Sequence, residues 1–264
     1  MPAADIGEGA VWVTGIGTLI RVDPADPTAD DRVTIGGLFA AHSLSVAERV
    51  VWVASPTGVA RVSASDLDVL RSVELVEPPA VVEVYVAAGS GRVWAVVGDG
   101  QLARIDPRTA EITGQVDVGL SATAISTGFG AVWVADDLSG TITRIDPETL
   151  ELGRPVEVSG QLDDIEAGAG AVWILDSDAG VVTPVDPDSG AVGAPVRVGL
   201  EPTDLATGLD SVWVTNNEEG TISRVDPITG SAVETLDVGA PVATIAVDEP
   251  TRRIWVVVAE LRAG

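Results

Sequence analysis

The sequence contains no cysteine and no lysine, and it has only one histidine. Without cysteine the chain can form neither a disulfide nor a thiolate metal site, and its redox compartment stays undetermined. No apolar stretch approaches the roughly 18 residues that a membrane-spanning helix requires, so we expect no membrane insertion of this segment. Residues 1–9 carry neither a basic start nor an apolar core, and they show no signal peptide.

Basic residues are scarce as well, because 40 Asp and Glu face only 15 Arg, for a formal net charge of -25. Affinity for a phosphate backbone comes mostly from Lys and Arg, so this balance argues against nucleic acid as a partner. The acidity itself is typical of a solvated surface and bears on solubility and association rather than on the fold.

Tryptophan is the residue whose placement is most regular. The seven copies are separated by 40, 42, 39, 40, 40 and 42 residues, and each lies in a short apolar run such as Val-Trp-Val. They are Trp12, Trp52, Trp94, Trp133, Trp173, Trp213 and Trp255. A period near 40 residues with strand-length apolar runs is the signature of a β-propeller, with one four-stranded blade per repeat. We expect all seven tryptophans to be core residues between blades.

The copy at residues 122–159 shows how one repeat divides. Short strands are expected at 123–126, 131–135, 141–145 and about 153–158, joined by turns in an antiparallel meander. An Asp-Pro pair, here Asp146-Pro147, opens the turn between the third and fourth strands. Asp can accept a bond from the backbone ahead of it, and Pro presets φ for a type I turn.

The seventh copy is incomplete. It supplies the first two strands of a repeat, at 242–247 and 253–258, but no sequence comparable to the third and fourth strands. The sequence therefore predicts an all-β fold, a single domain over residues 1–264 that forms a seven-bladed propeller with only the first two strands in its last blade. Either the chain is a fragment of a longer protein, or a two-stranded remnant closes the ring. We favour a fragment, because an uncovered edge strand invites aggregation. A longer protein of this kind would be secreted or displayed at the cell surface.

The repeat resembles the YVTN-type and virginiamycin B lyase-like β-propeller families. The string Gly-x-Gly-Ala-Val-Trp-Val occurs at 128–134, and Gly-Thr-Ile-x-Arg-Ile/Val-Asp-Pro occurs at 140–147 and again within 220–230. The resemblance implies the fold over nearly the whole chain. It does not imply an activity, since such repeats occur in enzymes and in sensor modules alike.

Virginiamycin B lyases use a His with Glu residues and a Mg ion to open a cyclic ester by elimination. The present chain has a single histidine, His42, and carries Asp136, Asp176 and Asn216 where those lyases often place a glutamate after the blade tryptophan. The resemblance therefore does not carry the catalytic residues over. The gluconolactonase-like hydrolases, which are similar more loosely, hold a divalent cation at the pore with Glu, Asn and Asp ligands.

Acidic residues gather in the loops that open on one face of the predicted ring. This face is the usual functional face of a rigid repeat scaffold. The candidate ligand-binding residues are Asp136, Asp137, Asp163, Asp164, Asp176, Asp204, Asn216 and Asn217. Crowded carboxylates raise one another's pKa or recruit a hard cation such as Ca or Mg. The alternative is that these loops are ordinary solvated hairpins.

Two functions remain open. The first is a non-catalytic binding, sensor or scaffold module for an unknown protein or small-molecule ligand, with no cofactor. The second is a metal-dependent lyase or hydrolase in which Asp163, Asp164 and Asp204 hold Ca or Mg at the pore entrance. His42, which aligns with Thr123 and Asp163, would then transfer the proton.

Overall fold

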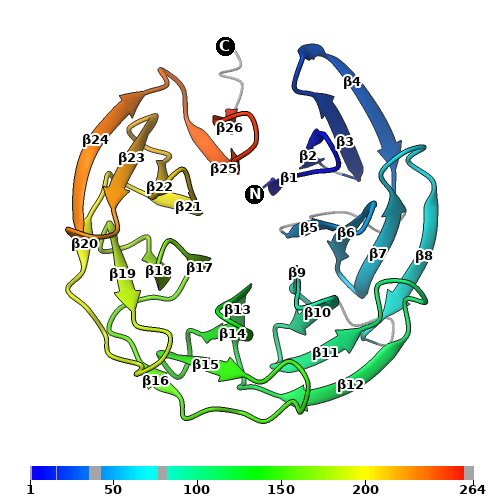
Figure 1. The fold of residues 1–264 in the computed structure, drawn as a ribbon, viewed down its shortest axis with the longest axis horizontal. Helices are drawn as coiled ribbons and strands as arrows, with labels where there is room; N and C mark the ends of the chain where they lie inside the picture. Colours follow the sequence, from blue (N-terminus) through cyan, green and yellow to red (C-terminus); the bar gives the residue numbers. More distant parts are fainter. Residues whose placement is uncertain (1, 16, 36–42, 77–81, 259–264) are drawn as a thin grey trace.

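The structure, a computed structural model, describes residues 2–15, 17–35, 43–76 and 82–258, and every helix or strand assigned in these ranges is a β-strand. The strands form six four-stranded sheets and one two-stranded sheet, arranged around a central axis (Figure 1). The all-β propeller is therefore confirmed, with six complete blades. None of the described residues belongs to a helix of the length and apolar character needed to cross a membrane.

Each blade is an antiparallel meander whose first strand lies nearest the axis (Figure 1). The innermost strands are β1 (Ala4–Gly7), β5 (Leu44–Ala47), β9 (Val84–Gly89), β13 (Ala122–Gly128), β17 (Asp164–Gly168), β21 (Pro202–Gly208) and β25 (Val242–Asp248). The second strands are β2 (Ala10–Gly15), β6 (Val50–Ser55), β10 (Arg92–Val97), β14 (Ala131–Asp136), β18 (Ala171–Asp176), β22 (Ser211–Asn216) and β26 (Arg253–Val258). The third strands are β3 (Thr18–Asp23), β7 (Gly58–Ser63), β11 (Gln101–Ile105), β15 (Thr141–Ile145), β19 (Val181–Val185) and β23 (Thr221–Asp226). The fourth strands are β4 (Asp26–Thr34), β8 (Val69–Glu74), β12 (Ile112–Asp117), β16 (Val156–Glu157), β20 (Val196–Arg197) and β24 (Ser231–Asp237).

The predicted strands of the reference repeat are found, but its fourth strand is shorter than expected. The structure has β16 at Val156–Glu157, preceded by an isolated bridge between Ile145 and Leu152. Proline at position 155 has no amide hydrogen to give to the ladder, which interrupts the pairing with β15. The short strand is thus a consequence of one residue type on an outer edge.

The Asp-Pro turns form as the sequence predicts. Oδ1 of Asp146 accepts bonds from the amides of Glu148 at 2.9 Å and Thr149 at 2.8 Å. These two amide bonds hold the pKa of the Asp146 carboxyl below its ordinary value. The turn fixes the direction in which the fourth strand leaves the third.

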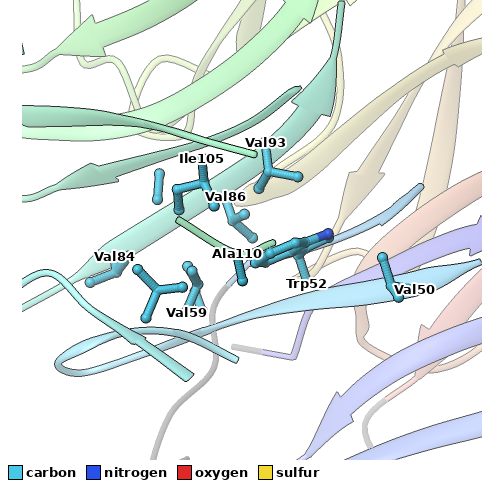
Figure 2. Packing of buried hydrophobic residues seen from close by; sticks show 11 residues of the cluster. Val50, Trp52, Val59, Val84, Val86, Val93, Ile105 and Ala110 are labelled. Carbon is cyan, nitrogen blue, oxygen red and sulfur yellow. The ribbon is translucent and has the colours of Figure 1, made fainter. Parts of the chain in front are cut away.

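Tryptophans fill the space between neighbouring blades. Trp52 of β6 packs with Val84, Val86 and Ile105 of the next sheet, as Figure 2 shows. Six of the seven tryptophans are buried, with exposed fractions of 6% or less. Trp255 is the exception to the prediction that all seven are core, because it is only half-buried. Its strand, β26, has no third strand beside it among the described residues.

The two-stranded sheet of β25 and β26 lies between the sixth four-stranded sheet and the first (Figure 1). Its inner strand β25 contacts both β21 and β1. Arg253 Nη1 also donates to the carbonyl of Pro24, in the first sheet, at 2.9 Å. The hairpin predicted for the seventh copy is present in this position, while the seven-bladed architecture stays a prediction.

Candidate functional site

A cavity of about 830 Å³ runs along the axis, and residues from all seven innermost strands line it. Its acidic lining residues are Asp5, Glu83, Asp163, Asp164, Glu166 and Asp204. No Arg or His occurs among the described residues that line it. Burying carboxylates without a countercharge is costly, so the chemistry of this cavity depends on what offsets them.

Strand register determines which positions of the innermost strands carry these groups. Asp5, Ser45, Ser126 and Glu166 each pair directly opposite the blade tryptophan of their own sheet. Residues that pair across a ladder point to the same face of the sheet. The four polar side chains therefore share one level of the cavity wall.

The innermost strands are edge strands, and in five of them free amides are satisfied by side chains of the preceding blade. Asp5 Oδ2 accepts a bond from the Val46 amide at 2.8 Å, and Ser126 Oγ accepts one from the Ala167 amide at 3.0 Å. The same role is played by Ser43 for Val86, by Ser45 for Ala88, by Asp164 for Leu205 and by Asp204 for Ile245. Since buried amides require partners, these polar residues join one blade to the next.

Glu166 bridges two neighbouring blades. Its Oε2 accepts a bond from the Ser126 hydroxyl of β13 at 3.0 Å, and its Oε1 accepts one from the Thr207 hydroxyl of β21 at 3.3 Å. Burial raises the pKa of Glu166 to about 7, although both hydroxyls oppose the shift. Burial likewise raises the pKa of Asp5 to about 6, against the amides of Val46 and Ile6. Both carboxyls therefore titrate near neutral pH.

Asp164 and Asp204 form a coupled pair at the next level. Burial and the neighbouring charge of Asp204 raise the pKa of Asp164 well above its ordinary value. Burial also raises the pKa of Asp204, but the Thr244 hydroxyl and the Ile245 amide stabilise its charged form. The interaction with Asp204 thus favours the protonated form of Asp164. We call Asp5, Asp164, Glu166 and Asp204 the acidic arc, since their strands β17, β21 and β1 follow one another with β25 around the axis (Figure 1).

The three residues proposed as metal ligands, Asp163, Asp164 and Asp204, all line the cavity. Asp163 is exposed, and its Oδ2 accepts bonds from the amide of Ser177 at 2.8 Å and its hydroxyl at 2.6 Å. Across the described ranges, no three or more His, Asp or Glu side chains are grouped closely enough to hold a metal ion. A divalent cation at this entrance remains a hypothesis.

Three of the predicted loop residues stand at the ends of second strands, where they are buried and bonded to backbone. Asp136 Oδ2 accepts a bond from the Leu120 amide at 2.8 Å, and Asn216 Oδ1 accepts one from the Gly199 amide at 2.9 Å. Burial alone would raise the pKa of Asp136, but the amides around it outweigh burial and lower it. Asp176 occupies the equivalent position and accepts a bond from the Ala179 amide at 2.8 Å. None of these three lines the cavity.

The remaining candidates lie near the same loops. Asp137 Oδ1 accepts a bond from the Leu162 amide of the next sheet at 3.0 Å, and the Asn217 amide donates to the Glu201 carbonyl at 2.9 Å. Neither residue lines the cavity. His42 lies outside the described residues.

Two members of the acidic arc, Asp5 and Glu166, are not among the residues predicted from the sequence. The predicted residues were assigned to loops, whereas these two lie inside strands. The signal that could have found them is their register, because both pair with a blade tryptophan. The Tyr85 hydroxyl donates to Glu83 Oε2 at 2.9 Å, and burial together with that charge raises the pKa of Tyr85.

The chain matches no protein-family model and no curated protein sequence. Among solved structures, it is similar to a streptogramin B lyase with a TM-score of 0.82 and 15% identity, covering 97% of this chain and 89% of that one. It is also similar to a catalytically inactive H270A virginiamycin B lyase from Staphylococcus aureus with quinupristin, with a TM-score of 0.80, 16% identity, and 97% and 90% coverage. A third similar structure is BamB from Moraxella catarrhalis, with a TM-score of 0.69, 17% identity, and 96% and 80% coverage. These likenesses confirm the predicted resemblance to virginiamycin B lyase-like propellers at the level of the fold.

Proposed function

We propose that the chain is a non-catalytic binding module that holds a positively charged ligand in the acidic arc. The observation that carries this proposal is a cavity of about 830 Å³ lined by all seven innermost strands, with six acidic residues, four of them in the acidic arc, and no Arg or His among its described lining residues. Without a countercharge, raised pKa values reduce the cost of burying these groups by keeping protons on them. A bound cation offsets the same charges and displaces the protons.

An organic cation suits the arc better than a metal ion. The four carboxyls come from three strands and already accept bonds from amides and hydroxyls, so their free lone pairs point in several directions. A guanidinium or polyamine carries several N–H donors and can satisfy dispersed acceptors, whereas a small divalent ion requires ligands that converge at about 2.0 to 2.6 Å. The ligand class is therefore a small organic cation or the basic side chain of a partner protein.

We also propose that β25 and β26 are the inner half of a seventh blade. Residues of β25 line the cavity in the same way as the innermost strands of the six complete sheets. Its partner β26 places Trp255 opposite Ala246, as the other blades place their tryptophans. With this hairpin the ring of inner strands closes between β21 and β1.

The likeness to streptogramin B lyase over 97% of the chain favours a second candidate, a metal-dependent lyase or hydrolase. In that case Asp163, Asp164 and Asp204 hold Ca or Mg, and His42 transfers the proton. The two candidates differ in which charge they bind. The module takes an organic cation, and the enzyme takes a divalent ion.

Calorimetric titration of the purified chain tests the two candidates. The titrants are agmatine, spermidine, Ca and Mg at fixed ionic strength, each in two buffers of different ionisation enthalpy so that released protons are counted. We expect an organic cation to bind with proton release, more tightly at pH 8 than at pH 5.

Two variants locate that binding. Asp164→Asn combined with Asp204→Asn should abolish it, whereas Asp178→Asn, an exposed loop residue that does not line the cavity, should leave it unchanged. Binding of a divalent ion that the double variant removes would support the enzyme instead. Absence of binding by every titrant would overturn the proposal.

A further inference from the structure

The acidic arc has two levels along the axis. Asp5 and Glu166 pair directly opposite the tryptophan of their own blade, whereas Asp164 and Asp204 pair opposite the residue two positions after it. All four line the cavity. Since side chains two residues apart on a strand share a face, the two levels are separated by two residues of strand, about 6.4 to 6.8 Å. A ligand that contacts both levels therefore carries its positive charges at about that separation.

An aromatic side chain lies at the level of Asp164 and Asp204. Tyr85 of β9 pairs opposite Val96, which is also two positions after a blade tryptophan, and it is the one aromatic residue among the described residues that line the cavity. Figure 1 shows β9 on the opposite side of the axis from β21 and β25. The Tyr85 hydroxyl donates to Glu83, so the ring is the part of this side chain that remains for a ligand. Aromatic rings and carboxylates both attract ammonium groups, and this level offers both.

The charges of the arc act between blades at both levels. Burial and the charge of Glu83 raise the pKa of Tyr85 most, and the charge of Asp164, three blades along from Glu83 in part of the same cavity wall, adds to the shift. Burial raises the pKa of Glu166 most, and the charge of Asp5 in the first blade adds to it. Because such effects weaken with distance, a positive charge at either level interacts with carboxyls from more than one blade.

Small side chains leave room beside Asp5 and Glu166. In three other sheets the residue opposite the blade tryptophan is alanine, and all three alanines line the cavity, namely Ala87, Ala206 and Ala246. A methylene chain packs against methyl groups without leaving a polar group unpaired. The wall between the two charged levels therefore suits an alkyl chain that runs along the axis.

From this arrangement we infer that the cavity binds a linear diamine, with one ammonium group at each level. The first ammonium lies between Tyr85 and the pair of Asp164 and Asp204, and the second contacts Glu166 and Asp5. Four methylenes suit this spacing, since the nitrogens of extended 1,4-diaminobutane span nearly the two-residue rise of a strand. Three methylenes place the nitrogens too close together, and six place them too far apart. This inference rests on the proposed binding of an organic cation and adds the number and spacing of its charges.

Calorimetric titration of the purified chain at pH 8 with amines of different length tests this inference. The titrants are n-butylamine, 1,3-diaminopropane, 1,4-diaminobutane and 1,6-diaminohexane at fixed ionic strength. At this pH Asp5 and Glu166, with pKa values of about 6 and about 7, are charged. We expect 1,4-diaminobutane to bind about ten- to hundredfold more tightly than n-butylamine, because it makes a second set of hydrogen bonds to charged groups. It should also bind more tightly than the shorter and the longer diamine.

Variants at each level separate the two contacts. Glu166→Gln combined with Asp5→Asn should reduce the affinity for 1,4-diaminobutane to that for n-butylamine, and should leave n-butylamine unchanged because its single charge prefers the level with the aromatic ring. Tyr85→Ala should weaken binding of all four amines about three- to tenfold, whereas Tyr85→Phe, which keeps the ring, should not. Thermal unfolding of each variant shows whether it is folded, and the comparison of chain lengths needs no variant.

Equal affinities of n-butylamine and the three diamines would overturn the inference. A preference for 1,4-diaminobutane that survives in the folded Glu166→Gln and Asp5→Asn double variant would overturn it as well. In both cases, binding of agmatine or spermidine that depends on Asp164 and Asp204 would still support the proposed function. If none of the organic cations binds, the inference and the proposed function are both overturned.

Discussion

Replacing Glu166 by glutamine isolates the cost of ionising one buried carboxyl in the cavity wall. The glutamine side chain has nearly the shape of the protonated glutamate and keeps an oxygen for the Ser126 or Thr207 hydroxyl, which donate to the native side chain at 3.0 and 3.3 Å. It has no charged form. Any difference between variant and native chain that depends on pH therefore reports the ionisation of Glu166.

The sign and size of the expected difference in stability follow from the raised pKa of Glu166. Between its ordinary pKa of 4.5 and about 7, the native carboxyl keeps a proton that the unfolded chain has lost. The free energy of unfolding therefore falls as pH rises through this window, and the stabilising contribution present below pH 4.5 is lost above about 7. A shift of this size corresponds to at most about 3 kcal/mol. Glu166→Gln should be near neutral at pH 4 and stabilising by up to about 3 kcal/mol at pH 8.

Thermal unfolding at pH 4, 6 and 8 measures this difference. For a domain of this size the gain at pH 8 corresponds to roughly 5 to 10 °C in Tm. Glu157→Gln, which changes an exposed side chain on β16, controls for the lost charge. The reasoning would be refuted if the difference in Tm between Glu166→Gln and the native chain were the same at all three pH values. Burial would then not oppose the ionisation of Glu166.

Two further predictions concern packing. Trp133→Ala should cost about 3 to 5 kcal/mol in urea unfolding, because Trp133 is 2% exposed, whereas Trp255→Ala should cost less than half of that because Trp255 is only half-buried. Gly160→Ala should lower Tm, because Gly160 has φ of +101° and a Cβ there would lie 2.0 Å from Asp176 Oδ2; equal Tm values for the two chains would contradict this.

The fold is predictable because its signals repeat. Each blade places one tryptophan in a strand that is covered on both faces, and the period of about 40 residues leaves room for four short strands. As the pattern predicts, Asp146 accepts a backbone bond at its turn and Trp133 is buried in its strand. The fourth strand was less predictable, since a proline at position 155 shortens it and outer strands carry little apolar pattern.

The site was less predictable because its residues do not repeat. The position opposite the tryptophan is Asp5 in the first blade and Glu166 in the fifth, but alanine in three other places. The sequence pattern alone does not show that this position faces inward. The register of the strands must be known first. Conversely, Asp136 and Asn216 fall in polar loops and look available, while in the structure their oxygens are bonded to backbone amides.

Residues of the acidic arc both stabilise the fold and form the proposed ligand site. Asp5 and Asp204 hold the inner strand of the following blade through the amides of Val46 and Ile245. A carboxylate accepts such bonds more strongly than a neutral carboxyl does, yet burial favours the neutral form. For Asp5, whose pKa burial raises to about 6, the two requirements conflict near neutral pH, and the proposed cation would resolve the conflict by stabilising the charged form. If the proposed ligand binds at the acidic arc, its binding and the attachment of one blade to the next would depend on the same protons.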